Sequence, residues 1–264
     1  MNKTAVISGA SSGLGYELSK LLCGKYGCRV VGLARRKERL DAVREELGEN
    51  FTPFVCDVTS EIDRARLFDF VTENGINPDI LINNAGILPE FSCFTPESSA
   101  ELGRVMELNF HSHVKMCALF LPLLLKSEHG AIVNVASSAA LATLPGTAAY
   151  SASKSALLAF TESLSLEYGK SLFVSAVCPG MTATELFDSH EGSSLVDKFA
   201  PSAEKTAKKI VRRLRRGRRM IVTGPDAHLM SGLRRILGRG ALRIFAFFIK
   251  SVKLPMFKDT FYKK

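Results

Sequence analysis

A tyrosine and a lysine four residues apart, Tyr150 and Lys154, stand at the head of a helical pattern. On a helix this spacing places both side chains on one face. A lysine beside a phenol favours the ionised phenol and lowers its pKa, so that the phenol can give or take a proton near neutral pH. On the pair alone, a solvated tyrosine and lysine at a helix start is the better interpretation, because Y-x-x-x-K recurs by chance, so the rest of the chain must decide.

The segment before this pair reads as a strand followed by a loop. The strand covers residues 131–135, and Ser137 and Ser138 come directly after it. A loop of small residues, 139–149, carries the turn pair Pro145-Gly146 and leads into the helix. This strand, loop and helix form the stretch around which the chain is organised.

A glycine-rich turn is the second chemical signal. It lies between an apolar strand, residues 4–8, and a helical pattern, residues 14–26, and reads Ser8-Gly9-Ala10-Ser11-Ser12-Gly13-Leu14-Gly15. Glycines in this context let the backbone approach a pyrophosphate, which lies at the helix N-terminus. The spacing differs from G-x-G-x-x-G, and an ordinary glycine turn is the alternative. The strand–turn–helix context favours a phosphate cradle.

The next predicted strand, residues 29–34, ends in two arginines, Arg35 and Arg36. In dinucleotide-binding folds an acidic residue at this place binds the 2′-hydroxyl of NAD, whereas an arginine accommodates the 2′-phosphate of NADP. No acidic residue is present here, and arginine can grip a phosphate with two hydrogen bonds. The pattern favours NADP(H) over NAD(H), with a pair of solvated arginines opening the next helix as the alternative.

Composition narrows the class of protein. The chain has 264 residues, of which 46% are apolar, enough for one large domain or two small ones. Its six cysteines show no C-x-x-C or paired spacing, which argues against a disulfide framework or a zinc site and favours a reducing compartment. The five histidines show no metal-ligand spacing, so no metal site is expected. No signal peptide or transmembrane run is evident, and a cytoplasmic location is expected.

Charge is segregated along the chain. Residues 205–264 carry 18 Lys/Arg and 2 Asp/Glu, a balance of +16, whereas the remainder carries 17 and 24, a balance of −7. In the tail, residues 226–264, phenylalanines and aliphatic residues interleave with arginines and lysines. Such a tail suits peripheral contact with a membrane surface. Two alternatives remain: a helix packed on the body or on a dimer mate, and a cover over an apolar substrate pocket. Nucleic-acid binding is disfavoured, because the aromatic residues are not spaced as a stacking platform.

Four motifs together resemble the short-chain dehydrogenase/reductase family. They are the glycine motif, Asn83-Asn84-Ala85-Gly86 after an apolar strand, a serine thirteen residues before a tyrosine, and Tyr150-x-x-x-Lys154. The resemblance covers about residues 3–222. It implies a single-domain, Rossmann-like α/β fold in residues 1–225, with a doubly wound parallel sheet of about seven strands flanked by helices. Residues 226–264 are then a basic amphipathic extension.

The resemblance also implies catalytic roles. Ser137, rather than Ser138, fits the catalytic serine because it stands thirteen residues before Tyr150. Tyr150 fits the general acid or base, and Lys154 fits the group that lowers its pKa and holds the nicotinamide ribose. Asn109, in a predicted helix over residues 99–125, fits the asparagine that holds a water in the proton relay. Cys178 reads as a buried structural cysteine, because no histidine lies near it in the sequence.

A cofactor site follows from the same resemblance. Asp57 fits a carboxylate near the adenine, and residues 178–180 fit a loop over the nicotinamide. Ser12 replaces a basic residue found in some NADP-preferring relatives, so one phosphate contact is absent. The expected cofactor-binding residues are Gly9, Ser11, Ser12, Gly13, Leu14, Gly15, Arg35, Arg36, Asp57, Val58, Asn83, Ala85, Gly86, Tyr150, Lys154, Pro179, Gly180, Thr182 and Thr184.

These motifs predict an NADP(H)-dependent oxidoreductase that reduces a ketone to a secondary alcohol or runs the reverse reaction. An apolar, lipid- or steroid-like small molecule is the expected substrate, with residues 185–199 as a lid over it. A reductase of 3-oxoacyl groups on a carrier protein is one alternative, and a catalytically idle NADP-sensing protein is another. A homodimer or homotetramer is expected from the resemblance.

Overall fold

A computed structural model describes residues 3–187, 200–238, 240–252 and 257–261 of the chain. Seven parallel strands form one sheet in the order β3-β2-β1-β4-β5-β6-β7. In chain order the strands are β1 (Thr4–Ser8), β2 (Arg29–Ala34), β3 (Phe51–Val55), β4 (Ile80–Asn83), β5 (Ala131–Val135), β6 (Phe173–Pro179) and β7 (Met220–Thr223).

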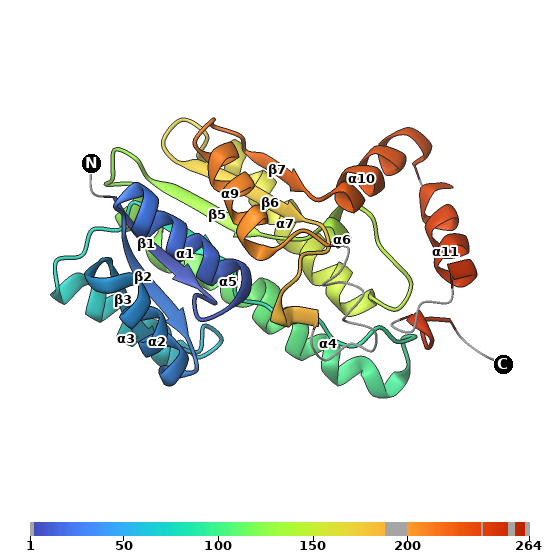
Figure 1. The fold of residues 1–264 in the computed structure, drawn as a ribbon, viewed down its shortest axis with the longest axis horizontal. Helices are drawn as coiled ribbons and strands as arrows, with labels where there is room; N and C mark the ends of the chain where they lie inside the picture. The colour runs from blue at the N-terminus through green and yellow to red at the C-terminus, as the bar shows by residue number, and fades with distance from the viewer. Residues whose placement is uncertain (1–2, 188–199, 239, 253–256, 262–264) are drawn as a thin grey trace.

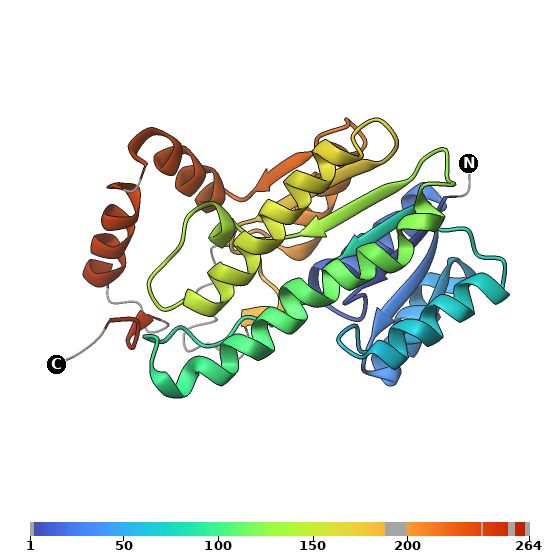
Figure 2. The same ribbon diagram turned by 180° about the vertical axis from the view of Figure 1, so that it is seen from behind.

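Helices cover both faces of the sheet (Figures 1 and 2). One face is covered by α1 (Gly13–Tyr26), α2 (Lys37–Leu47) and α9 (Ala203–Leu214). The other face is covered by α3 (Glu61–Glu73), α5 (Ser112–Leu124) and α7 (Ala148–Glu167). The doubly wound parallel α/β fold predicted from the sequence is therefore confirmed.

The buried strands explain why the sheet forms. Every residue of β1 and of β5 is buried, as expected for strands of a parallel sheet with helices on both faces. The strand order reverses between β1 and β4, and there the carboxyl ends of neighbouring strands splay their loops apart. Ser8 of β1, Asn83 of β4 and Val135 of β5 end at this edge. The glycine turn, the Asn-Asn-Ala-Gly loop and Ser137 are thus brought together.

The long helix predicted over residues 99–125 is interrupted. The structure shows α4 (Ser99–Met106), a π-helical turn (Glu107–His111) and α5 in succession. Single π-turns inside α-helices occur frequently at functional sites, because they rotate one side chain out of the regular helical register. Here the π-turn holds Asn109, which is fully buried.

The C-terminal part of the described chain extends from the edge of the sheet at β7. Helix α10 (Pro225–Leu237) packs on the short helix α6 (Ser138–Leu141), and α11 (Gly240–Val252) lies beside α10 at the end of the molecule remote from the N-terminus (Figure 1). The chain then returns to the body at residues 257–261. Across the described ranges, no helix has both the length and the apolar character that crossing a bilayer requires.

Candidate active site

A cleft of about 670 Å³ runs along the carboxyl edge of the sheet. One end lies against the glycine turn, and the other passes the head of α7. Fourteen of the residues predicted from the sequence line this cleft. They are Gly9, Ser12, Gly13, Leu14, Arg36, Ala85, Gly86, Ser137, Tyr150, Lys154, Pro179, Gly180, Thr182 and Thr184.

The glycine turn leaves the N-terminus of α1 open to an anion. The N-cap residue Ser12 makes no side-chain hydrogen bond to the helix, and the first turn has no acidic residue. The free N–H groups and the helix dipole therefore favour a phosphate. The turn is also too tight for side chains, because a Cβ added at Gly15 would lie 2.1 Å from the carbonyl oxygen of Gly9. This cradle fits the pyrophosphate of a dinucleotide.

Ser8 and Asn84 tie the glycine turn to the loop after β4. The Oγ of Ser8 accepts hydrogen bonds from the backbone N–H groups of Asn84 (2.9 Å) and Ala85 (3.0 Å). The Asn84 amide in turn donates to the carbonyl oxygens of Ser8 (3.1 Å) and Gly9 (3.4 Å). The Ser8 hydroxyl therefore holds the loop after β4 against the glycine turn, and the two loops form one wall of the cleft.

Ser137, Tyr150 and Lys154 meet in the middle of the cleft. Ser137 follows β5 and caps α6, where its Oγ accepts from the N–H of Ala139. Tyr150 and Lys154 lie on the first two turns of α7, with the Lys154 Nζ 5.9 Å from the centre of the tyrosine ring. The Lys154 Nζ donates to the carbonyl oxygen of Val135 at 2.9 Å. The three side chains predicted from the motifs thus face one space.

Burial controls the protonation of this group. It raises the pKa of Tyr150 above the usual value for a phenol, while the hydrogen bond with Ser137 works in the opposite direction. Burial also lowers the pKa of Lys154 to about 8. The sequence predicts that Lys154 lowers the pKa of Tyr150. In the structure, loss of solvent outweighs any such effect, and Ser137 is the group that favours the phenolate.

Asn109 holds the loop that follows Gly86. Its Oδ1 accepts from the N–H of Ile87, and its Nδ2 donates to the carbonyl oxygen of Ile87, both at 2.9 Å. The Nδ2 also lies 3.2 Å from the Oγ of Ser153 on α7. A Cβ added at Gly86 would lie 3.1 Å from Asn109 Oδ1 and 3.4 Å from Lys154 Nζ. Because both ends of the amide are engaged by protein, its side chain positions the loop beside Lys154.

The loop after β6 closes the cleft from the opposite side. Asp226, near the start of α10, accepts from the N–H of Met181 at 2.8 Å and crowds Gly180, where an added Cβ would lie 2.1 Å from its carboxylate. Thr184 packs beside Gly13, 3.3 Å from where a Cβ would stand there. Thr184 therefore approaches the phosphate cradle directly, and α10 holds the loop at Gly180 and Met181 through Asp226.

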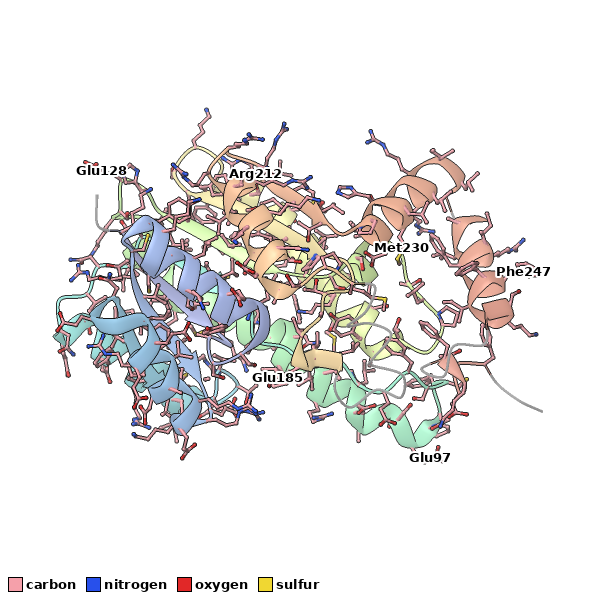
Figure 3. All side chains as sticks on the ribbon, viewed as in Figure 1. Glu97, Glu128, Glu185, Arg212, Met230 and Phe247 are labelled. Carbon is pink, nitrogen blue, oxygen red and sulfur yellow. The ribbon has the colours of Figure 1, made fainter. Side chains whose placement is uncertain are left out.

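Arg36 and its neighbour Arg39 are bridged by an acidic residue across the cleft. The Glu185 carboxylate lies 3.7 Å from Arg36 Nη2 and also accepts from Arg39 Nη1. Figure 3 shows Glu185 at the end of the loop that faces α1 and α2. Arg35 is exposed and does not line the cleft. Of the two predicted arginines, Arg36 is therefore the one that lies on the cleft, with Arg39 beside it.

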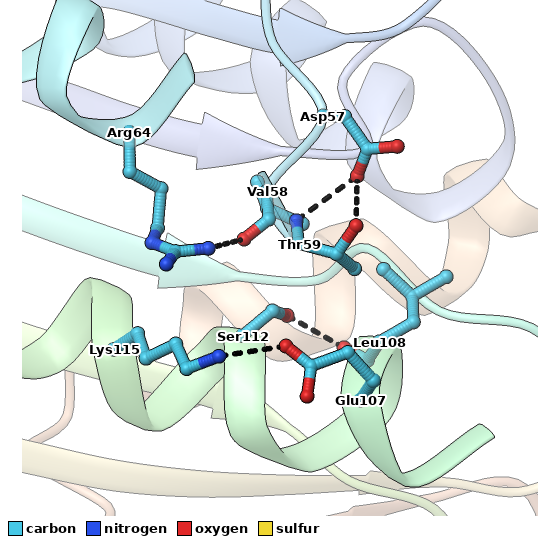
Figure 4. Close-up of polar contacts among 8 residues, drawn as sticks. All are labelled: Asp57, Val58, Thr59, Arg64, Glu107, Leu108, Ser112 and Lys115. Atoms are coloured by element: carbon cyan, nitrogen blue, oxygen red, sulfur yellow. Dashed lines mark hydrogen bonds and ion pairs between the residues drawn. The ribbon is translucent and has the colours of Figure 1, made fainter. Parts of the chain in front are cut away.

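Seven predicted cofactor or catalytic residues do not line the cleft: Ser11, Gly15, Arg35, Asp57, Val58, Asn83 and Asn109. The Asp57 carboxylate accepts from the N–H and the hydroxyl of Thr59, as Figure 4 shows, while Arg64 donates to the carbonyl of Val58. In the same view Ser112 and Lys115 anchor the π-turn through Leu108 and Glu107.

Asn83 points into the core instead of the cleft. It is fully buried, and its Nδ2 donates to Asn134 Oδ1 at 2.9 Å and to Cys117 Sγ at 3.2 Å. Successive side chains at the end of a strand face opposite sides, so Asn84 lines the cleft while Asn83 supports it from behind. The alternation along β4 was the signal that could have distinguished the two asparagines.

Apolar side chains also line the cleft, two of them, Phe91 and Leu186, packed against the cluster of Leu88, Ala139 and Tyr150, and the sequence did not predict these lining residues. Five apolar side chains line the cleft here, Leu88, Phe91, Leu144, Leu186 and Phe257, and we call them the apolar wall; Glu90, Glu101 and Arg104 line the cleft as well. Phe257 comes from the extreme C-terminal part of the chain and stacks on Phe91, with ring centres 5.1 Å apart. Of the predicted lid over residues 185–199, the described part is a short 3₁₀ turn (Glu185–Phe187), and residues 188–199 lie outside the described ranges.

His113 supports the loop after β4 from the core and makes the free energy of unfolding depend on pH. Its Nε2 lies 2.8 Å from the carbonyl oxygen of Ala85, and burial lowers its pKa to about 3. An unfolded chain therefore binds a proton that the folded chain does not, from about pH 6.5 downwards. This contribution to stability is complete above pH 6.5 and is lost as the pH falls towards 3.

We expect His113→Leu to be less stable than wild type at pH 7, because the Ala85 carbonyl loses its donor. The gap between the two free energies of unfolding should narrow by at most about 1.4 kcal/mol per pH unit on acidification. Urea unfolding of both proteins at pH 7, 6, 5 and 4 measures the gap. A gap that stays constant would show that His113 is not kept neutral by the fold.

Comparisons with known proteins agree with this geometry. Residues 3–193 match the family model for short chain dehydrogenases. The NADPH-dependent pterin aldehyde reductase of Arabidopsis thaliana is 32% identical over 203 residues, covering 76% of this chain and 84% of that protein. The 11-beta-hydroxysteroid dehydrogenase 1A of the same plant is 36% identical over 208 residues, 74% of this chain and 58% of that longer protein.

A solved structure is similar over nearly the whole chain. The short-chain dehydrogenase from Sphingobium yanoikuyae, in complex with NADPH, superposes with a TM-score of 0.73 at 26% identity, covering 89% of this chain and 94% of the other. The glycine cradle, the cleft and the residues at the head of α7 thus belong to an oxidoreductase scaffold that binds a nicotinamide cofactor. The chain is a member of the short-chain dehydrogenase family.

Proposed function

We propose that this protein is an NADP(H)-dependent oxidoreductase that reduces a ketone to a secondary alcohol, or oxidises the alcohol, on an apolar lipid- or steroid-like substrate. One observation carries the proposal: a single cleft is lined by the phosphate cradle, by Ser137, Tyr150 and Lys154, and by the apolar wall. A ketone at that wall would have its oxygen beside a phenol and a hydroxyl, and its carbon skeleton among apolar side chains.

NADPH, when bound, supplies the hydride. Tyr150 donates a proton to the carbonyl oxygen as negative charge develops there, and Ser137 donates a hydrogen bond to the same oxygen. Lys154 binds the ribose of the cofactor beside the phenol, and the hydrogen bond from Ser137 stabilises the phenolate that remains. In the oxidation direction the phenolate of Tyr150 accepts the proton from the alcohol.

Two alternative functions remain, and the substrate that is turned over distinguishes them from the proposed one. A reductase of carrier-bound 3-oxoacyl groups would use the basic residues of α9 and the segment after it, which include Arg212 at the surface (Figure 3). A cofactor-sensing protein without turnover has no need of Ser137, Tyr150 and Lys154 together on the cleft. A panel of steroid, long-chain and carrier-bound ketones, followed by NADPH absorbance with NADH in parallel, distinguishes them. No turnover of any ketone with either cofactor would contradict the proposal.

The preference for NADPH is proposed to depend on Arg36. We expect Arg36→Ala to weaken NADPH binding by roughly 10- to 100-fold, since a hydrogen bond to a charged group contributes about 1.5–3 kcal/mol. NADH binding should not change, because NADH has no 2′-phosphate. Arg29→Ala, at the exposed opposite end of β2, is the matched control and should bind both cofactors as wild type does. Equal losses for NADPH and NADH would remove Arg36 from this role.

We also propose two interaction partners for the protein, further copies of the same chain and a membrane surface. Membership of the family supports a homodimer or homotetramer, which light scattering of the purified protein would test. Peripheral contact with a membrane surface through residues 226–264 is proposed as well, and its support comes from the surface of the last two helices.

A further inference from the structure

Helix α11 presents an apolar face to solvent. Ile244, Phe247 and Phe248 are exposed, with 75% of Phe247 and 63% of Phe248 accessible. Figure 3 shows Phe247 on the side of α11 that faces away from the rest of the molecule. We call these three residues the α11 face. Just before it, Ile236 of α10 is 80% exposed as well. Large apolar side chains gathered in this way are unusual on a soluble surface and mark a contact site.

The exposure follows from the periodicity of the helix. Residues 244, 247 and 248 are spaced by three and four positions, so they share one side of the helix. Ile249 lies on another side of the helix and is buried, and Ala241, in the first turn, is buried as well. Helix α11 therefore has apolar residues both where it packs and where it meets solvent, and no packing within the described part of the chain covers the second set.

The charges around the α11 face have a single sign. Arg243 and Lys250, two turns apart, lie along one border of the face, and Arg235 of α10 is exposed nearby in sequence. The only acidic side chain in the described residues of α10 and α11 is Asp226, whose carboxylate accepts from Met181 in the body. The described surface of these two helices is thus apolar and basic, with no exposed acidic side chain beside the α11 face on either helix, which complements an anionic partner.

We infer that the α11 face is a docking surface for an anionic lipid bilayer, with Ile244, Phe247 and Phe248 entering the interface and Arg243 and Lys250 binding headgroups. Aromatic and aliphatic side chains bordered by basic residues are the pattern of helices that lie in the plane of a membrane interface. A second copy of the chain fits less well, because two such faces would bring their basic borders together. An acidic protein would satisfy the charges and leave the phenylalanines without an apolar partner.

The same extension also builds the substrate end of the cleft. After α11 the chain returns, and Asp259 pairs with the segment after β4, where its carbonyl oxygen accepts from the N–H of Cys93 at 2.7 Å. Thr260 packs against Gly146, and Phe257 lines the cleft against Phe91. The C-terminal extension therefore carries both the α11 face and Phe257 of the substrate pocket. If the proposed function holds, docking would bring this pocket to the bilayer, and its substrate would be an apolar ketone dissolved in lipid.

Flotation of the full-length protein with vesicles tests the docking surface. We expect wild type to float with vesicles that contain phosphatidylglycerol, to float poorly with pure phosphatidylcholine, and to be released by salt. The variant Phe247→Ser/Phe248→Ser should lose at least tenfold in apparent affinity. Leu166→Ser, which removes an exposed apolar side chain at the far end of α7, is the matched control and should float as wild type does.

Turnover of a small water-soluble ketone shows whether the double variant is folded, since neither phenylalanine belongs to the cleft. Wild type that never floats, or a double variant that floats like wild type, would overturn the docking surface. A double variant that only changes from oligomer to monomer in light scattering would assign the α11 face to a second copy of the chain and overturn the docking surface too.

Phe257→Ala separates the docking surface from the proposed function: it should alter the reduction of long apolar ketones and leave flotation unchanged. If no ketone is reduced, flotation still decides the docking surface.

Discussion

Tyr150→Phe is expected to lower kcat for ketone reduction by roughly 10²- to 10⁴-fold, the range that a positioned general acid contributes. The substitution removes one hydroxyl and keeps the ring that is buried against Leu88 and Ala139. NADPH affinity should therefore stay near the wild-type value, because the cradle and Arg36 are untouched. Steady-state kinetics and NADPH fluorescence titration measure the two quantities separately.

A matched control lies on the same helix. Tyr168→Phe removes a phenolic hydroxyl at the C-cap of α7, outside the cleft, and should keep wild-type turnover. The direction of the pH dependence provides a second check. Because burial raises the pKa of Tyr150, the protonated form that reduction needs should persist into alkaline solution, while alcohol oxidation should rise with pH. Near-normal turnover in Tyr150→Phe would remove the assignment.

Gly15→Ala is expected to abolish useful cofactor binding, with an increase of at least about tenfold in the Kd for NADPH and a loss of about 1–3 kcal/mol in stability from overpacking. The added Cβ would lie 2.1 Å from the Gly9 carbonyl oxygen and 2.6 Å from the Asn84 amide. The glycine turn must then move away from Asn84, and the N-terminus of α1 loses the position from which its N–H groups face the cleft. Isothermal titration with NADPH measures this loss.

Helix α1 contains its own control for this substitution. A Cβ added at Gly24 meets nothing within 4 Å. Gly24→Ala should therefore bind NADPH as wild type does and gain up to about 1 kcal/mol in stability from helix propensity. If Gly15→Ala were folded by circular dichroism and bound NADPH with the wild-type Kd, the glycine turn would not be the phosphate cradle.

The two predictions differ in which part of the site they change. Tyr150 acts on the reacting oxygen, so its loss should reduce kcat and leave binding intact. Gly15 does not line the cleft, yet the absence of a side chain there leaves room for the Asn84 amide to donate to the Gly9 carbonyl oxygen. This contact joins the two loops that form the cofactor side of the cleft. A glycine outside the cleft can thus be required for binding because its neighbours occupy the space that a side chain would fill.

The sequence by itself determined the elements and the chemistry that depends on short spacing. Alternating strands and helices predicted the parallel sheet, because apolar runs between amphipathic helices must be buried on both faces. The spacing of four positions from Tyr150 to Lys154, and of thirteen from Ser137 to Tyr150, stayed meaningful because a helix and a tight loop preserve local distances. The glycine turn was readable for the same reason: its strand and helix neighbours are adjacent in the chain.

Long-range packing decided the rest. Asn83 and Asn84 are adjacent in sequence, and only the pairing of β4 with β5 shows that Asn83 faces Asn134 in the core. The pKa of Tyr150 is raised because distant elements exclude water from it, which no local motif encodes. Phe257 stands more than a hundred residues from Phe91, its stacking partner in the cleft. Local spacing survives folding, whereas burial and contacts between remote segments exist only once the sheet has brought them together.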